Sequence, residues 1–223
     1  MSATNHSLRL AAASLLAMAL GSYVFATDAK AEDARDISRI NSGVTIDSED
    51  QVGDVSSING GIHLSDGASA EKVSTVNGSI EIEDHVSLAS AHTVNGGIRL
   101  GENVTVRGEL ETVNGGIYTE SGTEVAFSIE TVNGRLRLEN TRVRENVETS
   151  NGDIDIIRGS VIEGDVVIRG RQHWWDRLFN FNKREPELTI DSDSSVLGDI
   201  HLYQEVELNI ADGAVHGAII EHF

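Results

Sequence analysis

The chain repeats an Asn-Gly pair at intervals of 18 or 19 residues. A variant of the pair, Asn41-Ser42-Gly43, comes before the first regular copy. The asparagines of the series are Asn41, Asn59, Asn77, Asn95, Asn114, Asn133 and Asn151. A period this regular indicates a repeat architecture in which each copy is one structural unit stacked on the next.

The apolar spacing within one period distinguishes two folds. Asn-Gly is a strong hairpin signal, so an antiparallel meander is one interpretation. The period that starts at Val94 instead has apolar residues separated by steps of 4, 2, 4, 2 and 4: Val94, Ile98, Leu100, Val104, Val106 and Leu110. This is three copies of a six-residue unit. We therefore expect an all-β fold, a single-stranded parallel β-helix with three sides, about 18 residues per coil and these aliphatic residues pointing inward.

The general preference of parallel crossovers predicts right-handed winding. About ten coils fit between Ile40 and Ile219, which at the usual strand spacing gives a rod roughly 45 Å long. We expect the seven asparagines to form a turn ladder whose amides bond from coil to coil, with left-handed backbone angles at the Asn-Gly corner. A sugar-binding groove lined by the same amides is the functional alternative.

A second column is predicted to point outward, immediately after the aliphatic residue that follows each Asn-Gly pair. Its members are Thr45, His63, Glu81, Arg99, Tyr118, Arg137 and Asp155. Glu81 with Arg99, and Arg137 with Asp155, are expected to form exposed cross-strand ion pairs.

Residues 169–187 interrupt the repeat with an aromatic and basic segment. Its candidate interaction patch consists of Arg171, Trp174, Trp175, Arg177, Leu178, Phe179 and Phe181. Four apolar members lie at spacings that share one helical face: Trp174, Trp175, Leu178 and Phe179. This indicates either a brace packed on the solenoid or a docking surface for an envelope protein, a glycan or a membrane. Gly164-Asp165 and Gly198-Asp199 are 34 residues apart, almost two periods, so the segment is interpreted either as an excursion or as a distorted coil.

The first 31 residues read as a secretory signal peptide. Arg9 precedes a short apolar run, and Ala29-Lys30-Ala31 provides a small-x-small cleavage site. The predicted organisation is a signal peptide at 1–31 and a β-solenoid domain at 32–223. The predicted location is the periplasm, the cell surface or the exterior.

Composition excludes several functional classes. With no cysteine, the chain has no disulfide framework, thiolate metal site or cysteine nucleophile. A net charge of -19 opposes nucleic-acid binding. The pairs Asp153/Asp155 and Asp191/Asp193 lack the glycine-aspartate nonapeptide of calcium-binding solenoids. We therefore expect no metal, no cofactor and no catalytic residues.

The repeated Thr-Val-Asn-Gly-Gly-Ile motif, over roughly residues 38–168, resembles the bacterial families of exported adhesin repeats. The pattern of Ile162-Glu163-Gly164-Asp165-Val166 and Val196-Leu197-Gly198-Asp199-Ile200 is similar to the coils of bactofilins, the polymer-forming bacterial scaffold proteins. Both resemblances imply a β-solenoid without catalytic residues. Bactofilins are mostly cytoplasmic, so the export signal does not fit a cytoskeletal role.

These observations predict a non-enzymatic structural, adhesin-like or scaffold protein of the bacterial envelope. The open β-edges at the ends of a solenoid indicate self-association through those ends. The alternative is a β-helix that binds or cleaves glycans.

The signal peptide leads to a first prediction. When the full-length chain is expressed in a bacterium, Edman sequencing or mass spectrometry of the exported product should give Glu32 as its first residue. Ala31→Tyr places a large ring in the small-residue cleavage site and should accumulate the uncleaved precursor. An exported product that keeps residues 1–31 would contradict the assignment.

Overall fold

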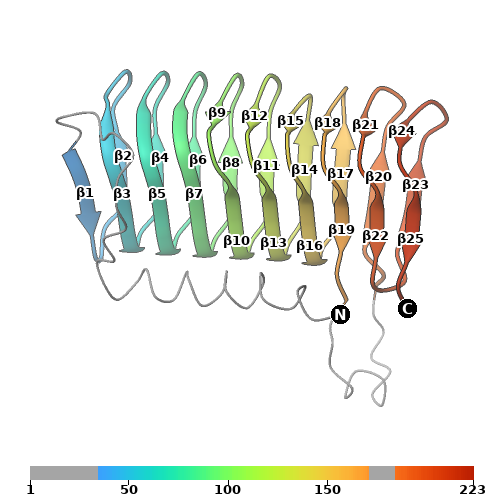
Figure 1. The fold of residues 1–223 in the computed structure, drawn as a ribbon. Helices are drawn as coiled ribbons and strands as arrows, with labels where there is room; N and C mark the ends of the chain where they lie inside the picture. Colours follow the sequence, from blue (N-terminus) through green and yellow to red (C-terminus); the bar gives the residue numbers. More distant parts are fainter. Residues whose placement is uncertain (1–34, 171–183) are drawn as a thin grey trace, which may run out of the picture.

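The computed structural model describes residues 35–170 and 184–223. These residues form a row of stacked coils, from β1 at one end to β25 at the other (Figure 1). All regular elements of the described residues are β-strands, and no helix among them could cross a membrane. The signal-peptide assignment and the interaction patch, residues 171–181, lie outside the described residues.

Each coil contributes one strand to each of three faces. The first face is a nine-stranded parallel sheet: β2 (Val44–Ile46), β4 (Ile62–Leu64), β6 (Ile80–Ile82), β8 (Ile98–Leu100), β11 (Ile117–Thr119), β14 (Leu136–Glu139), β17 (Ile154–Ile157), β20 (Glu187–Ile190) and β23 (Glu207–Ile210). The second face has six short strands: β9 (Thr105–Val106), β12 (Glu124–Val125), β15 (Arg142–Val143), β18 (Val161–Ile162), β21 (Ser195–Val196) and β24 (Val215–His216).

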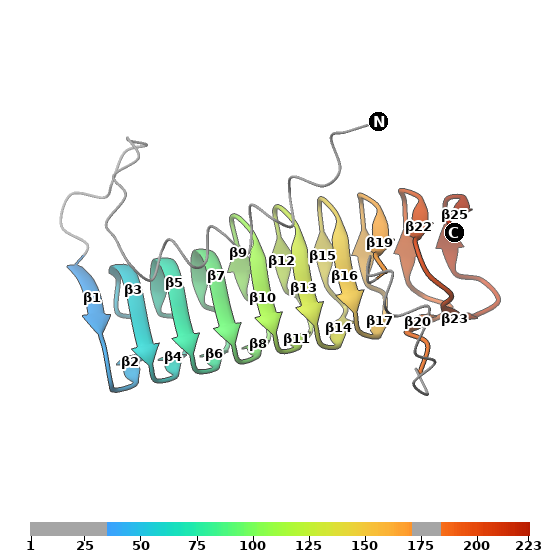
Figure 2. The ribbon, with the colours of Figure 1, turned by 90° about the horizontal axis from the view of Figure 1, so that it is seen from below.

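The third face begins with β1 (Arg35–Arg39) and continues through strands of the same sheet. These are β3 (Val52–Asn59), β5 (Ser69–Asn77), β7 (Ser87–Asn95), β10 (Leu110–Asn114), β13 (Ile129–Asn133), β16 (Val147–Asn151), β19 (Val166–Ile168), β22 (Ile200–Leu202) and β25 (Ile219–Glu221). Figure 2 shows these strands side by side along the stack. The structure therefore has the predicted three-sided parallel solenoid, and no Asn-Gly pair forms a hairpin tip.

The second and third faces belong to one 16-stranded sheet because β3, β5 and β7 continue around the corner between them. In the coil of β7, two residues separate the buried Leu88 from the buried Ala91. In the next coil, three residues separate Val106 from Leu110, and two strands replace the single one. One additional corner residue is therefore enough to interrupt the strand.

The described residues form nine coils rather than about ten, because no strand lies between β17 and β20 on the first face. β17 pairs directly with β20, with Ile154 opposite Leu188. The neighbouring faces show the same step, since β18 pairs with β21 and β19 with β22. The 34-residue separation thus corresponds to a single step of the stack. Nine strands at the usual spacing give a rod of roughly 40 Å.

Aliphatic side chains fill the interior in columns. One column on the first face is at most 1% exposed: Ile62, Ile80, Ile98, Ile117, Leu136, Ile154 and Leu188. A single buried cluster continues from Val44 to Leu202. Because each strand buries only one side, a coil depends on its two neighbours to cover its apolar residues.

The prediction that Val94 points into the interior was wrong. Val94 is only partly buried, whereas Thr93 is fully buried. The Thr93 hydroxyl donates to the Gly78 carbonyl oxygen at 2.9 Å, and Thr112 donates in the same way to Gly96 at 2.8 Å. A buried carbonyl needs a donor, so threonine fits this inward position better than valine.

The seven asparagines form a continuous ladder of amide hydrogen bonds. In each step the Nδ2 of one asparagine donates to the Oδ1 of the asparagine in the preceding coil, at 2.8 to 3.1 Å. Six such bonds connect Asn41 to Asn151. Each interior amide both donates and accepts, which holds the corner in register.

The glycines after these asparagines are required by close packing. A Cβ on Gly96 would lie 2.0 Å from the Gly78 carbonyl oxygen, and one on Gly115 would lie 1.9 Å from that of Gly96. The expected left-handed backbone is instead found at another corner, after the first-face strand. Its positive-φ residues include Glu49, Gly67, His85, Asn103, Gly122 and Asn140. None of the ladder asparagines has a positive φ.

The glycine column leads to a second prediction. Gly96→Ala should lower the free energy of unfolding by about 3 kcal/mol, because the methyl group forces two backbones apart. Gly61→Ala should cost less than about 1 kcal/mol, since its Cβ would lie 3.1 Å from the nearest backbone oxygen and Ser79 occupies the equivalent position. Urea unfolding followed by circular dichroism measures both. Equal losses for the two variants would contradict the packing explanation.

Candidate functional site

The outward side of the first face has a depression around Tyr118. The strand register places Arg99, Tyr118 and Arg137 opposite one another on β8, β11 and β14, as the sequence predicted for this column. A hollow of about 370 Å³ is lined by Arg99, Glu102, Tyr118, Thr119, Glu120, Ser121, Arg137, Glu139 and Arg158. The size is within the range of small-ligand sites.

Charge pairing holds the arginines of this depression in place. Arg137 Nε donates to Glu139 Oε1 at 2.8 Å, and Arg158 reaches the other oxygen of Glu139 at 2.9 Å. The guanidinium of Arg99 lies 5.8 Å from the centre of the Tyr118 ring, a cation–π arrangement. The predicted Glu81–Arg99 ion pair is absent, because Arg99 lies over Tyr118. Arg137 and Asp155 do approach, at 3.8 Å.

An ion-pair network continues from the depression toward β17 and β20. Arg135 donates to Asp153 at 2.6 Å, and Arg184 approaches the same carboxylate at 3.3 Å. Burial alone would raise the pKa of Asp153. The pKa is lowered instead, because Arg135 and the Glu187 backbone N–H donate hydrogen bonds to the ionised carboxylate. Asp153 therefore acts as a structural counter-ion for Arg135 and Arg184.

The third face has a different outward column, which the sequence reasoning missed. It consists of Ser38, Ser56, Ser74, His92, Glu111, Glu130 and Glu148, each paired with the next. The signal was present, because each of these residues lies three positions before a ladder asparagine. We call Glu111, Glu130 and Glu148 the carboxylate column.

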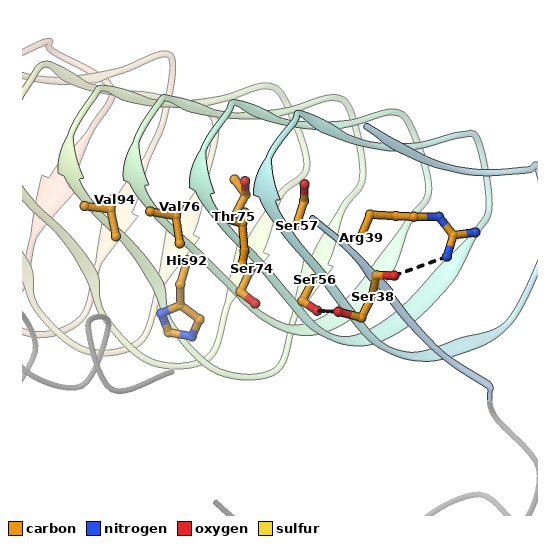
Figure 3. A pocket seen from close by; sticks show the side chains of 10 residues that line it. Ser38, Arg39, Ser56, Ser57, Ser74, Thr75, Val76, His92 and Val94 are labelled. Carbon is orange, nitrogen blue, oxygen red and sulfur yellow. Dashed lines mark hydrogen bonds between the residues drawn. The ribbon is translucent and has the colours of Figure 1, made fainter. Parts of the chain in front are cut away.

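A shallow groove of about 120 Å³ lies over the serine end of this face (Figure 3). Ser56 and Ser38 are joined at 3.0 Å by a hydrogen bond between their hydroxyls, and His92 forms the far end of the groove. Ile58, Val76 and Val94 line one side. The groove is too small for a drug-sized ligand.

The carboxylate column brings like charges into neighbouring strands. Burial and the charges of Glu148, Glu111 and Glu109 raise the pKa of Glu130 to about 7. The Ser128 hydroxyl opposes this shift by donating to Glu130 Oε1 at 2.9 Å. Arg169 donates two hydrogen bonds to the Glu148 carboxylate, and its positive charge offsets the negative charge at that end of the column.

Comparison with protein-family models, with curated proteins and with solved structures finds no match for this chain. The resemblances to adhesin repeats and bactofilins therefore stay predictions.

Glu130 leads to a third prediction. Because its folded pKa of about 7 exceeds the ordinary value near 4.3, the folded state binds the proton more tightly between these pH values. Raising the pH from 5 to 8 should therefore lower the free energy of unfolding, by up to about 3 kcal/mol from this group. Urea unfolding at a series of pH values, with a chelator present, measures the effect.

Two variants isolate this contribution. Glu130→Gln removes the titrating group and should flatten this part of the pH dependence. Ser128→Ala removes a donor that favours the ionised form, and should move the loss of stability to higher pH. A Glu130→Gln profile that follows the parent profile would contradict the assignment.

Proposed function

We propose that this protein is an exported, non-enzymatic rod of the bacterial envelope that acts as a structural or adhesin-like scaffold. The observation that carries the proposal is the continuity of the stack. Nine coils share one buried core, and the amide ladder connects seven of the asparagine corners without a break. A solenoid of this kind extends along one axis and holds its surface residues at fixed spacing.

The sequence supports the location that the proposal requires. Residues 1–31 have the features of a secretory signal, and the chain has no cysteine for an oxidising compartment to modify. The acidic composition suits a surface that stays soluble and does not bind nucleic acid. Self-association through the coil ends, or attachment through residues 171–181, would connect the rod to its surroundings.

A second candidate function is glycan binding or cleavage at the depression around Tyr118. An aromatic ring beside Arg99 and Arg137, with Glu120 and Glu139 in the same hollow, provides stacking area and hydrogen-bonding groups for a sugar. Arginines and carboxylates together are also what a glycan-cleaving β-helix would need. The sequence reasoning found no such cluster, because its members come from three strands and their connecting turns.

A fourth prediction compares the two functions. Mature protein, residues 32–223, is incubated with envelope and extracellular polysaccharides. New reducing or unsaturated ends are measured together with retention on immobilised polysaccharide. The rod function predicts no cleavage, and it predicts that Tyr118→Ala leaves any retention unchanged. The glycan function predicts retention or cleavage that Tyr118→Ala abolishes and that the control Tyr203→Ala, an aromatic residue elsewhere on the solenoid, preserves.

Deletion of one coil tests the rod directly. Removing residues 59–76 joins Ile58 to Asn77 and restores the repeat. Small-angle scattering should then show a folded particle shorter by about 5 Å. The variant should remain in the same envelope or extracellular fraction as the parent. An unfolded variant, or one released from that fraction, would contradict a function that depends on the stacked rod as a whole.

A further inference from the structure

We propose that His92, Glu109 and Glu111 form a binding site for one divalent transition-metal ion, of which Zn²⁺ is the representative. His92 is on β7, Glu111 is on β10, and Glu109 immediately precedes β10. One donor atom from each residue lies within 4.8 Å of the other two. Within residues 35–170 and 184–223, no other group of three such side chains converges in this way.

The separation of the donor atoms fits a small ion. His92 Nδ1 lies 3.4 Å from Glu111 Oε2. In a tetrahedral zinc site with bonds near 2.0–2.1 Å, neighbouring donor atoms are about 3.3 Å apart. Glu109 approaches the other ring nitrogen, with its Oε1 at 3.9 Å from His92 Nε2, so the half-exposed Glu109 side chain must turn toward Nδ1 to bind the same ion as Glu111. Three protein ligands leave a fourth position for water.

The second nitrogen of the imidazole has a partner that orients the ring. The Ser90 hydroxyl lies 3.1 Å from His92 Nε2. When Nε2–H donates to this hydroxyl, Nδ1 presents its lone pair on the side of Glu111. Metal-binding histidines commonly hold their other ring nitrogen in such a hydrogen bond, which fixes the tautomer. His92 is only 5% exposed, so the ring is also held by packing.

The charges around the site favour a divalent cation. Glu130 on β13 lies next to Glu111 and adds a third acidic side chain to the two that would bind the ion. Lys72 on β5 interacts with Glu109 and Glu111, and Arg169 pairs with Glu148. A bound ion would offset the repulsion among the acidic groups, while Lys72 would compete with it.

His63, on β4 of the first face, provides a matched control. It also lies between two glutamates, with Nε2 at 2.9 Å from Glu83 and Nδ1 at 3.8 Å from Glu81. This group is more exposed, and its donor atoms do not converge. The two histidines therefore share their residue types and differ in geometry.

A fifth prediction tests the site with the mature protein, freed of metal by a chelator and then dialysed. Zn²⁺ is titrated against a fluorescent competing chelator, and Co²⁺ binding is followed by its visible absorption. We expect one equivalent of each ion and an absorption spectrum typical of tetrahedral Co²⁺. His92→Ala should weaken binding at least about tenfold, while His63→Ala should change it less than about twofold.

Two further variants keep the test independent of folding. Glu109→Gln alters a half-exposed side chain, should leave the circular dichroism unchanged and should weaken Zn²⁺ binding. Lys72→Met removes the competing charge and should tighten it. The proposal is overturned if the parent binds no Zn²⁺, if His63→Ala and His92→Ala cause equal losses, or if a folded Glu109→Gln binds as the parent does.

Discussion

Parallel hydrogen bonding between equivalent positions of successive coils is the constraint on which this structure depends. Each strand of a face pairs in register with the strand one coil later, so a residue lies above its counterpart, 18 or 19 positions on over most of the stack and 34 positions on between β17 and β20. The structure can therefore be described as a set of columns, each made of equivalent residues from successive coils. What one column contains decides whether stacking stabilises the fold, costs free energy or creates a site.

Different columns of this solenoid show each of these outcomes. Asparagine stacks favourably because its amide both donates and accepts, and the ladder from Asn41 to Asn151 uses both groups. Glycine is required where the backbones of successive corners nearly touch, as at Gly96. Stacked glutamates are costly to ionise, because burial and then the charges of neighbouring carboxylates raise the pKa of Glu130.

The outward faces differ in what they offer a partner. Around Tyr118, paired arginines and glutamates surround an aromatic ring in an open hollow. On the third face, acidic side chains and His92 form a compact group with few basic neighbours. A scaffold needs no such groups, so these two places are where a more specific activity of the rod would be found.

The sequence alone determined the class of fold and its period. The 18- and 19-residue spacing predicted a stacked repeat, and the 4-2-4-2-4 apolar pattern favoured three-sided coils over hairpins. The amide ladder also followed from the sequence, because identical residues at a constant period must lie above one another in a solenoid. The outward column through Tyr118 was predicted for the same reason.

Only the tertiary structure showed which side chains lie at the same corner and which hydrogen-bonding groups each corner requires. It replaced Val94 by Thr93 in the interior, because a corner carbonyl needs a donor there. It also showed that the coil of β20 follows the coil of β17 directly, since strand pairing, unlike sequence distance, identifies the next coil. His92, Glu109 and Glu111 come together at the corner between the second and third faces, whose length differs by one residue between coils. The distances between their side-chain atoms depend on the path of the backbone through this corner rather than on the repeat.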